Sequence, residues 1–401
     1  MVAKKFVRIA LGISGGVDSS VAALILKRKG LDVQGVFMRN WDVSDETGKC
    51  SVNKDLEDAE KTCSKLGIPL HEVNFSKEYW NFVFSDFIEQ YQMGKTPNPD
   101  ILCNKFIKFN QFVNYSLNRL GADAIATGHY AQTSFGPFLE AFDNQQGVRL
   151  LKAVDSFKDQ TLFLHQVHQE ALQKTMFPLG KFKKAQVKSI ARENNLMHVL
   201  NKKESTGICF VGKRNFSQFI SEYIPDRPGV FVDIDSGKVV GSHKGIHYWT
   251  IGQRCRIGGN PDRCFVARLI PETQEVQVAF GANHPVLWSQ HITTSRAHWI
   301  HSEPEILREG GVLDCDFRFQ HTDPLLPCKV MLKDNDSLLI KLDKPLFAIT
   351  SGQFAVLYKG NECLGGAQIK NSAPSFFSQY CLDNKLNYNF QSHKTHDFCN
   401  K

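Results

Sequence analysis

The chain has 401 residues, of which 42% are hydrophobic and 22% charged, an ordinary balance for a globular protein of two or three domains. No apolar run approaches the roughly 20 residues that a bilayer-spanning helix needs, which argues against a membrane-spanning protein. The net charge of +7 is compatible with a polyanionic partner, because lysine and arginine neutralise the phosphates of nucleic acids.

Strands and helices alternate through the first part of the chain. The patterns predict strands over 6–13, 31–38, 68–75 and 122–130, and helices over 17–29, 54–67, 78–93 and 105–120. Because the basic, apolar start continues directly into a glycine loop, we expect a buried first strand rather than a secretory signal. The alternation predicts an α/β fold with a doubly wound parallel sheet, in which ligands bind at the carboxyl ends of the strands.

The second part of the chain has short alternating strands separated by turn residues and no convincing long helix after about residue 225. We therefore expect a catalytic α/β domain over 1–213 and a small β-rich domain over 214–283. A C-terminal β-barrel is expected over 284–371, followed by a poorly ordered tail over 372–401.

The stretch "RIALGISGGVDSS" (8–20) runs from a strand through a glycine turn into a helix. Backbone N–H groups in such a turn, together with the positive end of the helix, form a site for phosphate oxygens. Ser14, Ser19 and Ser20 can donate hydroxyl hydrogen bonds, and Asp18 can hold Mg²⁺ carried by a nucleotide. The lysine of the usual P-loop is missing. A plain strand-to-helix turn is the alternative.

A carboxylate and a thiol lie close together in "GKTPNPDILCNKFIKF" (94–109). Pro97 and Pro99 disfavour helix, so we expect an extended turn and a helix from Asn104 onward. Asp100 and Cys103 would then lie at a helix amino terminus, where the dipole favours a thiolate. Taken alone, this stretch is better explained by an incidental buried cysteine in a proline-rich loop.

A second notable thiol, Cys209, lies in "KKESTGICFVG" (202–212), with Lys202 and Lys203 near enough in sequence to favour a thiolate. Taken alone, it also fits a core cysteine. The 11 cysteines include no CxxC pair and are odd in number, so we expect neither a zinc site nor a secreted disulfide framework. Cys50 is interpreted as structural, and Cys381 and Cys399 receive no role.

The loop "SGGVDSS" resembles that of the PP-loop ATP pyrophosphatases, which cleave ATP between the α- and β-phosphates; the missing lysine is consistent with pyrophosphate leaving as a unit. Together with "TPNPDILCNKFIKF" and "STGICF", its order and spacing resemble the tRNA-specific 2-thiouridylases. The segments "GVFMRNW", "ATGHY", "KDQTLFL", "IGQR" and "GQFAVLYKG" extend the resemblance over about residues 6–370. "SFKDQT" and "NKKES" are closest to the mitochondrial branch.

The resemblance implies ATP, with Mg²⁺, as cofactor, and no metal site of the protein's own. The ATP-binding residues it implies are Gly12, Ile13, Ser14, Gly15, Gly16, Val17, Asp18, Ser19, Met38 and Gly128. It further implies adenylation of O2 of the wobble uridine, with Cys209 as persulfide carrier. Cys103 would attack the persulfide and leave a Cys103–Cys209 disulfide for a reductant to reopen. Asp100 would act as general acid and base.

The resemblance also implies tRNA as substrate, particularly mitochondrial tRNAs for Lys, Glu and Gln, a persulfide donor protein as partner, a mitochondrial location and a monomeric state. The implied uridine-binding residues are Asn98, Pro99 and Asp100, and the implied tRNA contacts are His129, Lys158, Asp159, Gln160, Arg318, Phe319 and Gln353. Bacterial members often have Tyr at the position of Phe319. A phenylalanine lacks the hydroxyl but can still stack on a base. The basic helix 181–192 fits a phosphate track or a solvated face equally well.

Two other hypotheses remain at this stage. One is another PP-loop ligase or amidotransferase acting on a small carboxylic acid, which would need neither a second cysteine nor a β-rich half that binds RNA. The other is a catalytically silent tRNA-binding protein that keeps the fold.

Overall fold

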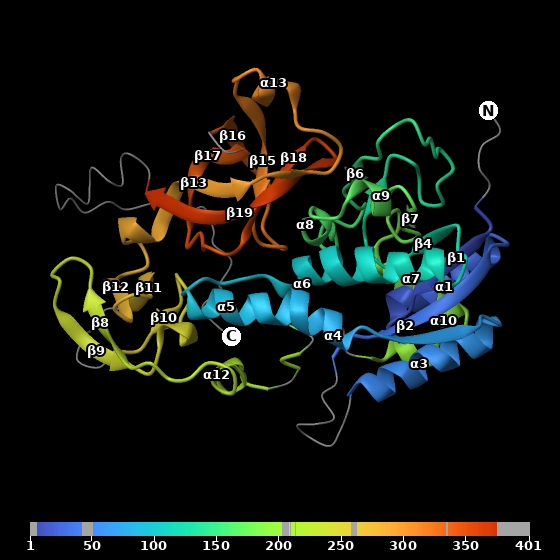
Figure 1. Cartoon of the computed structure of the whole chain (residues 1–401), viewed down its shortest axis with the longest axis horizontal. Coiled ribbons are helices and arrows are strands. Elements are labelled where there is room, and N and C mark those ends of the chain that lie inside the picture. Colours follow the sequence, from blue (N-terminus) through green and yellow to red (C-terminus); the bar gives the residue numbers. More distant parts are fainter. Residues whose placement is uncertain are drawn as a thin grey trace.

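The computed structural model describes residues 6–41, 51–202, 208, 210–212, 214–257, 263–333 and 336–374. The strands of this part of the chain form three sheets (Figure 1). No helix among the described residues is long and apolar enough to cross a membrane.

The first sheet is parallel and five-stranded, with the order β3-β2-β1-β4-β7. Its strands are β1 (Arg8–Gly12), β2 (Asp32–Arg39), β3 (Leu70–Asn74), β4 (Ala124–Ala126) and β7 (Thr175–Met176). The chain leaves β1 toward β2 and β3 on one side and later returns to β4 and β7 on the other. The predicted doubly wound parallel sheet is confirmed, and its switch point lies between β1 and β4.

Helices cover both faces of this sheet. Three successive residues of β1, Ile9, Ala10 and Leu11, are fully buried. Because neighbouring side chains on a strand point to opposite faces, this burial requires both faces of the sheet to be covered. Helix α1 (Val17–Arg28) packs beside α3 (Ser51–Leu66) and α10 (Lys184–Glu193), and α7 (Phe112–Asn118) packs against β4. The shorter helices are α4 (Ser76–Tyr79), α5 (Ser85–Gln92), α8 (Thr161–Leu164), α9 (Gln169–Leu172), α11 (Met197–Leu200) and α12 (Phe216–Ser221).

One helical segment begins earlier than the sequence predicts. Helix α6 (Pro99–Leu102) continues through π-helical turns over Cys103–Gln111 into α7, so the helix starts at Pro99 and not at Asn104. A proline is well accommodated at the first helical position, where its missing N–H would have no intrahelical partner. The expectation that Pro99 excludes a helix was therefore wrong.

The middle of the chain forms a second sheet with the order β10-β11-β12-β8-β9. Its strands are β8 (Gly229–Asp233), β9 (Val239–His243), β10 (Arg254–Cys255), β11 (Cys264–Ile270) and β12 (Glu275–Phe280). Phe231, Val266, Val276 and Val278 form most of its small core. The core is small, as expected for a β-rich module of this length.

The third sheet closes into a barrel of six strands. In order around the barrel these are β13 (Trp288–Arg296), β17 (Ser337–Phe347), β16 (Leu326–Leu332), β15 (Leu313–Arg318), β18 (Phe354–Lys359) and β19 (Glu362–Pro374). Strand β13 pairs with both β17 and β19, and this double pairing closes the circle. The predicted C-terminal β-barrel is confirmed, and among the described residues it contains one α-helix, α13 (Glu305–Arg308), and a 3-10 turn over Pro285–Leu287.

Two short strands of the α/β domain extend the barrel sheet. Strands β5 (Gln132–Thr133) and β6 (Leu150–Leu151) pair with each other, and β6 pairs with β19 through Leu150 and Cys363. Arg149 beside β6 also forms an ion pair of 3.0 Å with Glu362. The first domain and the barrel are therefore joined by backbone hydrogen bonds. The tail expected over 372–401 lies outside the described residues beyond position 374.

Candidate active site

The glycine loop lies at the carboxyl end of β1, where the sheet changes direction. Gly15 has a φ of 67°, and a Cβ there would collide with the carbonyl oxygen of Asp55, so only glycine fits. The Ser19 hydroxyl accepts a hydrogen bond from the Ser14 backbone N–H at 3.2 Å and donates one to the Gly16 carbonyl at 3.1 Å. These contacts hold the turn open above the amino terminus of α1, the geometry that binds anions.

The structure brings the other predicted nucleotide-binding residues to this loop. At the end of β4, the Cα of Gly128 lies so close to the first turn of α1 that an added Cβ would be 2.8 Å from the backbone nitrogen of Ser19. On β2, the side chain of Met38 lies against Gly12, where an added Cβ would be 3.2 Å from its methyl group. The loops after β1 and β4 therefore meet at the switch point, where open α/β sheets bind their ligands in a crevice.

Two side chains that the sequence did not suggest hold Asp18 in this crevice. The Lys184 ammonium donates to both carboxylate oxygens of Asp18, at 2.7 and 2.8 Å, and the Tyr130 hydroxyl donates to one of them at 2.9 Å. Lys184 opens α10, a long way along the chain from the glycine loop. A lysine from another element thus lies beside the first turn of α1, next to the glycine loop.

Lys202 also contacts the glycine loop. Its ammonium donates to the carbonyl oxygen of Gly15 at 3.0 Å and pairs with Asp58 at 2.9 Å and with Asp55. Burial lowers the pKa of Lys202, but the hydrogen bonds that its ammonium donates to the Asp55 and Asp58 carboxylates, together with their negative charges, outweigh burial and raise the pKa overall. The sequence suggested that Lys202 acts on Cys209. In the structure its charge faces the glycine loop and α3, whereas Cys209 lies outside the described residues.

Asp100 and Cys103 lie one turn apart on the helical segment that starts at Pro99. Cys103 is buried, with 4% of its surface exposed. Burial raises the pKa of the Asp100 carboxyl, and the charge of Lys108 opposes that rise. A half-buried acid beside a buried thiol can exist in its protonated form closer to neutral pH than an exposed aspartate, as a proton donor to a substrate oxygen requires.

This helical segment packs against the glycine loop and is anchored by the barrel. An added Cβ at Gly12 would be 3.5 Å from the ring of Phe112, at the start of α7. Before the helix, the N–H of Thr96 donates to the carbonyl oxygen of Ser351 at 2.9 Å, and the Gln353 amide donates to the carbonyl oxygen of Thr96 at 2.8 Å. Gln353, predicted to contact tRNA, thus also positions the loop that leads to Asn98.

His129 follows Gly128 and faces the same helical segment. Its Nδ1 lies 2.8 Å from the Thr127 hydroxyl, and its ring centroid lies 5.7 Å from that of Phe109. Burial, together with the charge of Lys108, holds the pKa of His129 well below its usual value. His129 is therefore neutral at physiological pH and is suited to hydrogen bonding rather than to ion pairing with a phosphate.

Three of the remaining predicted tRNA contacts meet at the interface between the α/β domain and the barrel. The carboxylate of Asp159, which is 1% exposed, accepts hydrogen bonds from the Ala153 N–H at 3.0 Å and the Thr161 hydroxyl at 2.8 Å, and pairs with Arg318 at 3.3 Å. Gln160 lies next to this pair and accepts from the Tyr130 N–H at 2.9 Å. A role of these residues in contacting tRNA stays a prediction.

Phe319 is 3% exposed and packs on Phe317 inside the barrel, with ring centroids 5.9 Å apart. In this arrangement its ring is covered by the protein, and stacking on a base would require it to move. Lys158, by contrast, is half-buried at the edge of the domain interface. The structure thus groups the predicted tRNA contacts in the α/β domain near the crevice, with Phe319 set apart from them.

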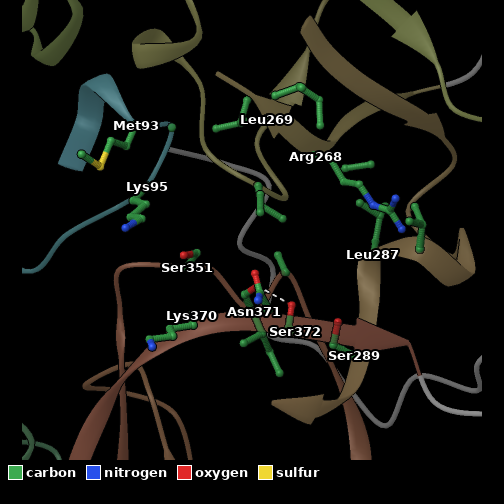
Figure 2. A pocket seen from close by; sticks show the side chains of 17 residues that line it. Met93, Lys95, Arg268, Leu269, Leu287, Ser289, Ser351, Lys370, Asn371 and Ser372 are labelled. Carbon is green, nitrogen blue, oxygen red and sulfur yellow. Dashed lines mark hydrogen bonds between the residues drawn. The ribbon is translucent and has the colours of Figure 1, made fainter. Parts of the chain in front are cut away.

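A cavity of about 370 Å³ lies where the end of α5, the second sheet and the barrel meet (Figure 2). Lys95, Arg268 and Lys370 contribute basic groups from these three parts of the chain, among mainly apolar and small side chains. None of the predicted site residues lines it. Among the described residues, no group of three or more His, Cys, Asp and Glu side chains could hold a metal ion. The chemistry therefore points to the crevice at the switch point.

Models of three domain families match the chain. They are the tRNA methyl transferase HUP domain over residues 7–213, the tRNA methyl transferase PRC-barrel domain over 217–280 and the aminomethyltransferase beta-barrel domain over 289–369. The three matches follow one another along the chain and cover most of it.

Curated proteins match over nearly the whole chain. A Drosophila melanogaster protein named mitochondrial tRNA-specific 2-thiouridylase 1 is 52% identical over 91% of this chain and 94% of its own length. The human protein of that name is 48% identical, over 92% of each chain. A tRNA-specific 2-thiouridylase from Bacillus pumilus is 44% identical over 90% of this chain and 94% of its own.

Proposed function

The chain belongs to the family of tRNA-specific 2-thiouridylases, and we propose that it is the enzyme that replaces O2 of a wobble uridine in tRNA with sulfur. The observation that carries the proposal is the crevice between the loops after β1 and β4. Beside it lies a helix that bears both Asp100 and Cys103. The names of the relatives support a mitochondrial location and mitochondrial tRNAs as substrates.

The crevice suits the activation step. ATP bound there, with Mg²⁺, would supply an AMP group for O2 of the uridine and release pyrophosphate. The backbone N–H groups of the glycine loop and the start of α1 would hold the phosphates. Asp18 would hold the cation, and Lys184, whose ammonium pairs with both Asp18 oxygens in the structure, would supply a positive charge to the phosphates. Asp100 would donate and accept the proton on the base.

The sulfur step assigns separate roles to the two cysteines. A donor protein would load Cys209 with a terminal sulfur as a persulfide. The Cys103 thiolate would attack the sulfur of Cys209, form a Cys103–Cys209 disulfide and release hydrosulfide. Hydrosulfide would then attack C2 and expel AMP, which carries O2 away. A dithiol reductant would supply the two electrons that reopen the disulfide.

The proposal is tested with the purified protein, ATP, an unmodified tRNA transcript with uridine at the wobble position, and a persulfide-loaded donor protein with a dithiol. The expected products are AMP, pyrophosphate and 2-thiouridine, the last identified by mass spectrometry of the nucleosides. Formation of AMP without 2-thiouridine would instead favour another ligase of this fold. Binding of tRNA without AMP release would indicate a silent binding protein.

Replacing Lys184 with Met is expected to weaken ATP binding about 10- to 100-fold, because a hydrogen bond to a charged group contributes about 1.5–3 kcal/mol. The Lys184 ammonium lies within 2.8 Å of both Asp18 oxygens, at the entrance of the phosphate site. ATP affinity is measured by calorimetric titration, with Lys188→Met on the same helix as the control. Affinities of Lys184→Met and wild type within twofold of each other would contradict this role.

A further inference from the structure

Phe157 is the most solvent-exposed large apolar side chain among the described residues, with 81% of its surface accessible. Val154, in the same loop, is 53% exposed. Burying an aromatic ring of this size in a partner removes a large apolar surface from water. None of the roles considered above uses this ring.

The loop that carries Phe157 is ordered by its own hydrogen bonds. The two carboxylate oxygens of Asp155 accept from the backbone N–H groups of Phe157, at 3.2 Å, and Lys184, at 2.8 Å. The N–H of Lys158 donates to the carbonyl oxygen of Asp155 at 3.1 Å, closing the turn. The ring is therefore presented on a fixed backbone, so little conformational freedom of this loop is lost on binding.

This loop lies between the two parts of the proposed site. On one side it is bonded to the backbone of Lys184, whose side chain holds Asp18 in the crevice. On the other side Asp159, two residues after Phe157, pairs with Arg318 of the barrel. The loop therefore connects a residue beside the glycine loop with a residue that contacts the barrel.

The surroundings of Phe157 are basic rather than apolar. The Val154 N–H donates to the carbonyl oxygen of Gly180 at 2.9 Å, which sets the loop beside the segment 180–184. In that segment Lys181 and Lys183 are exposed, and Lys158 is the next residue after the ring. An exposed aromatic ring among cations is the combination that binds unpaired nucleotides, because bases stack on the ring while the cations meet phosphates. A protein-docking surface would need a broader apolar patch.

We propose that Phe157 is a stacking platform for an unpaired base of the tRNA, with Lys181 and Lys183 contacting the adjacent phosphates. This proposal rests on the proposed function, since it names a contact of the same substrate. It also assigns the basic segment at the start of α10 to a phosphate track rather than to a solvated face.

The test compares Phe157→Ala, Phe157→Trp and the control Val239→Ala, whose side chain is 63% exposed on β9. The measured quantity is the dissociation constant of the unmodified tRNA transcript over a series of KCl concentrations. Phe157→Ala is expected to weaken binding about 5- to 100-fold at every KCl concentration, because one base–aromatic stack is lost. The slope of the logarithm of the tRNA association constant against log[KCl] is expected to stay unchanged, because no phosphate contact is removed.

Four comparisons make the assignment specific. Phe157→Trp is expected to bind like wild type, and its added indole fluorescence to be quenched by tRNA. Lys181→Ala and Lys183→Ala should each reduce the magnitude of this slope by about 0.7, the contribution of one phosphate contact with a single strand. A fully duplex RNA, which offers no unpaired base, should bind wild type and Phe157→Ala equally. Val239→Ala should bind tRNA like wild type.

Unchanged tRNA affinity of Phe157→Ala would overturn the proposal. If that variant bound tRNA normally but accepted sulfur poorly from the donor protein, the ring would instead be a protein contact. The proposed function is tested separately, by measuring 2-thiouridine formation with the wild-type enzyme. If wild type forms no 2-thiouridine, the proposed function fails; if it does and Phe157→Ala binds tRNA normally, only the stacking proposal fails.

Discussion

Replacing Cys103 with Ser is expected to lower the rate of 2-thiouridine formation by at least about 10³-fold while leaving ATP affinity within about twofold of wild type. A serine hydroxyl is not ionised near neutral pH and attacks sulfur poorly, so the persulfide on Cys209 would not be cleaved. The glycine loop, which is the proposed ATP site, is formed by other residues and stays intact. Nucleoside mass spectrometry and ATP titration measure the two quantities.

Cys63→Ser is the matched control, because Cys63 is also a buried thiol of the α/β domain, on α3. Burial raises the pKa of Cys63 to about 11, which disfavours the thiolate at neutral pH. Both substitutions place a hydroxyl in an apolar site and carry a similar structural cost. Normal 2-thiouridine formation by Cys103→Ser would exclude Cys103 as the attacking thiol.

Replacing Arg318 with Ala is expected to lower the free energy of unfolding by about 3–5 kcal/mol, because it leaves the buried Asp159 carboxylate without its cation. The side chains of Arg318 and Asp159 are only 8% and 2% exposed, and their charged atoms are 3.3 Å apart. The guanidinium also lies 5.5 Å from the centre of the Tyr358 ring. Urea unfolding, followed by circular dichroism, measures the change.

The control is Arg296→Ala in the same barrel. Arg296 and Asp336 form an ion pair of 3.1 Å, but their side chains are 79% and 53% exposed, so solvent screens the pair. Its loss should change the free energy of unfolding by at most about 1 kcal/mol. A double variant, Asp159→Asn with Arg318→Met, removes both buried charges and should lose less stability than Arg318→Ala. Equal effects of Arg296→Ala and Arg318→Ala would contradict the argument.

Local patterns were enough to predict the parallel sheet. The apolar run of β1, the glycine turn and α1 follow one another without interruption. The spacing of hydrophobic residues identifies the strand and the helix, and the glycines identify the turn between them. The position of the nucleotide crevice then follows from the rule that ligands bind where strand order reverses, and the structure brings Gly128 to the glycine loop as that rule requires. The family was recognisable from the same motifs.

The parts of the site that sequence reasoning missed depend on contacts between distant residues. Lys184 and Asp18 are 166 positions apart, and a lysine in a basic helix carries no local sign that it will reach the carboxylate of Asp18. The strands β5 and β6 are only two residues long, too short to produce an alternating pattern. Pro99 was misread because the same residue breaks a helix in its interior and starts one at its first position.

The pairing of β6 with β19 has a consequence for how the chain folds as it is synthesised. Arg149 and Glu362, which flank this pairing, are separated by 213 residues, so the edge of β6 stays uncovered until nearly the whole chain has left the ribosome. An uncovered strand edge is a site of mispairing and aggregation. A chain terminated before β19 would therefore lose more than the barrel: its first domain would carry an open edge, a target for chaperones and proteases.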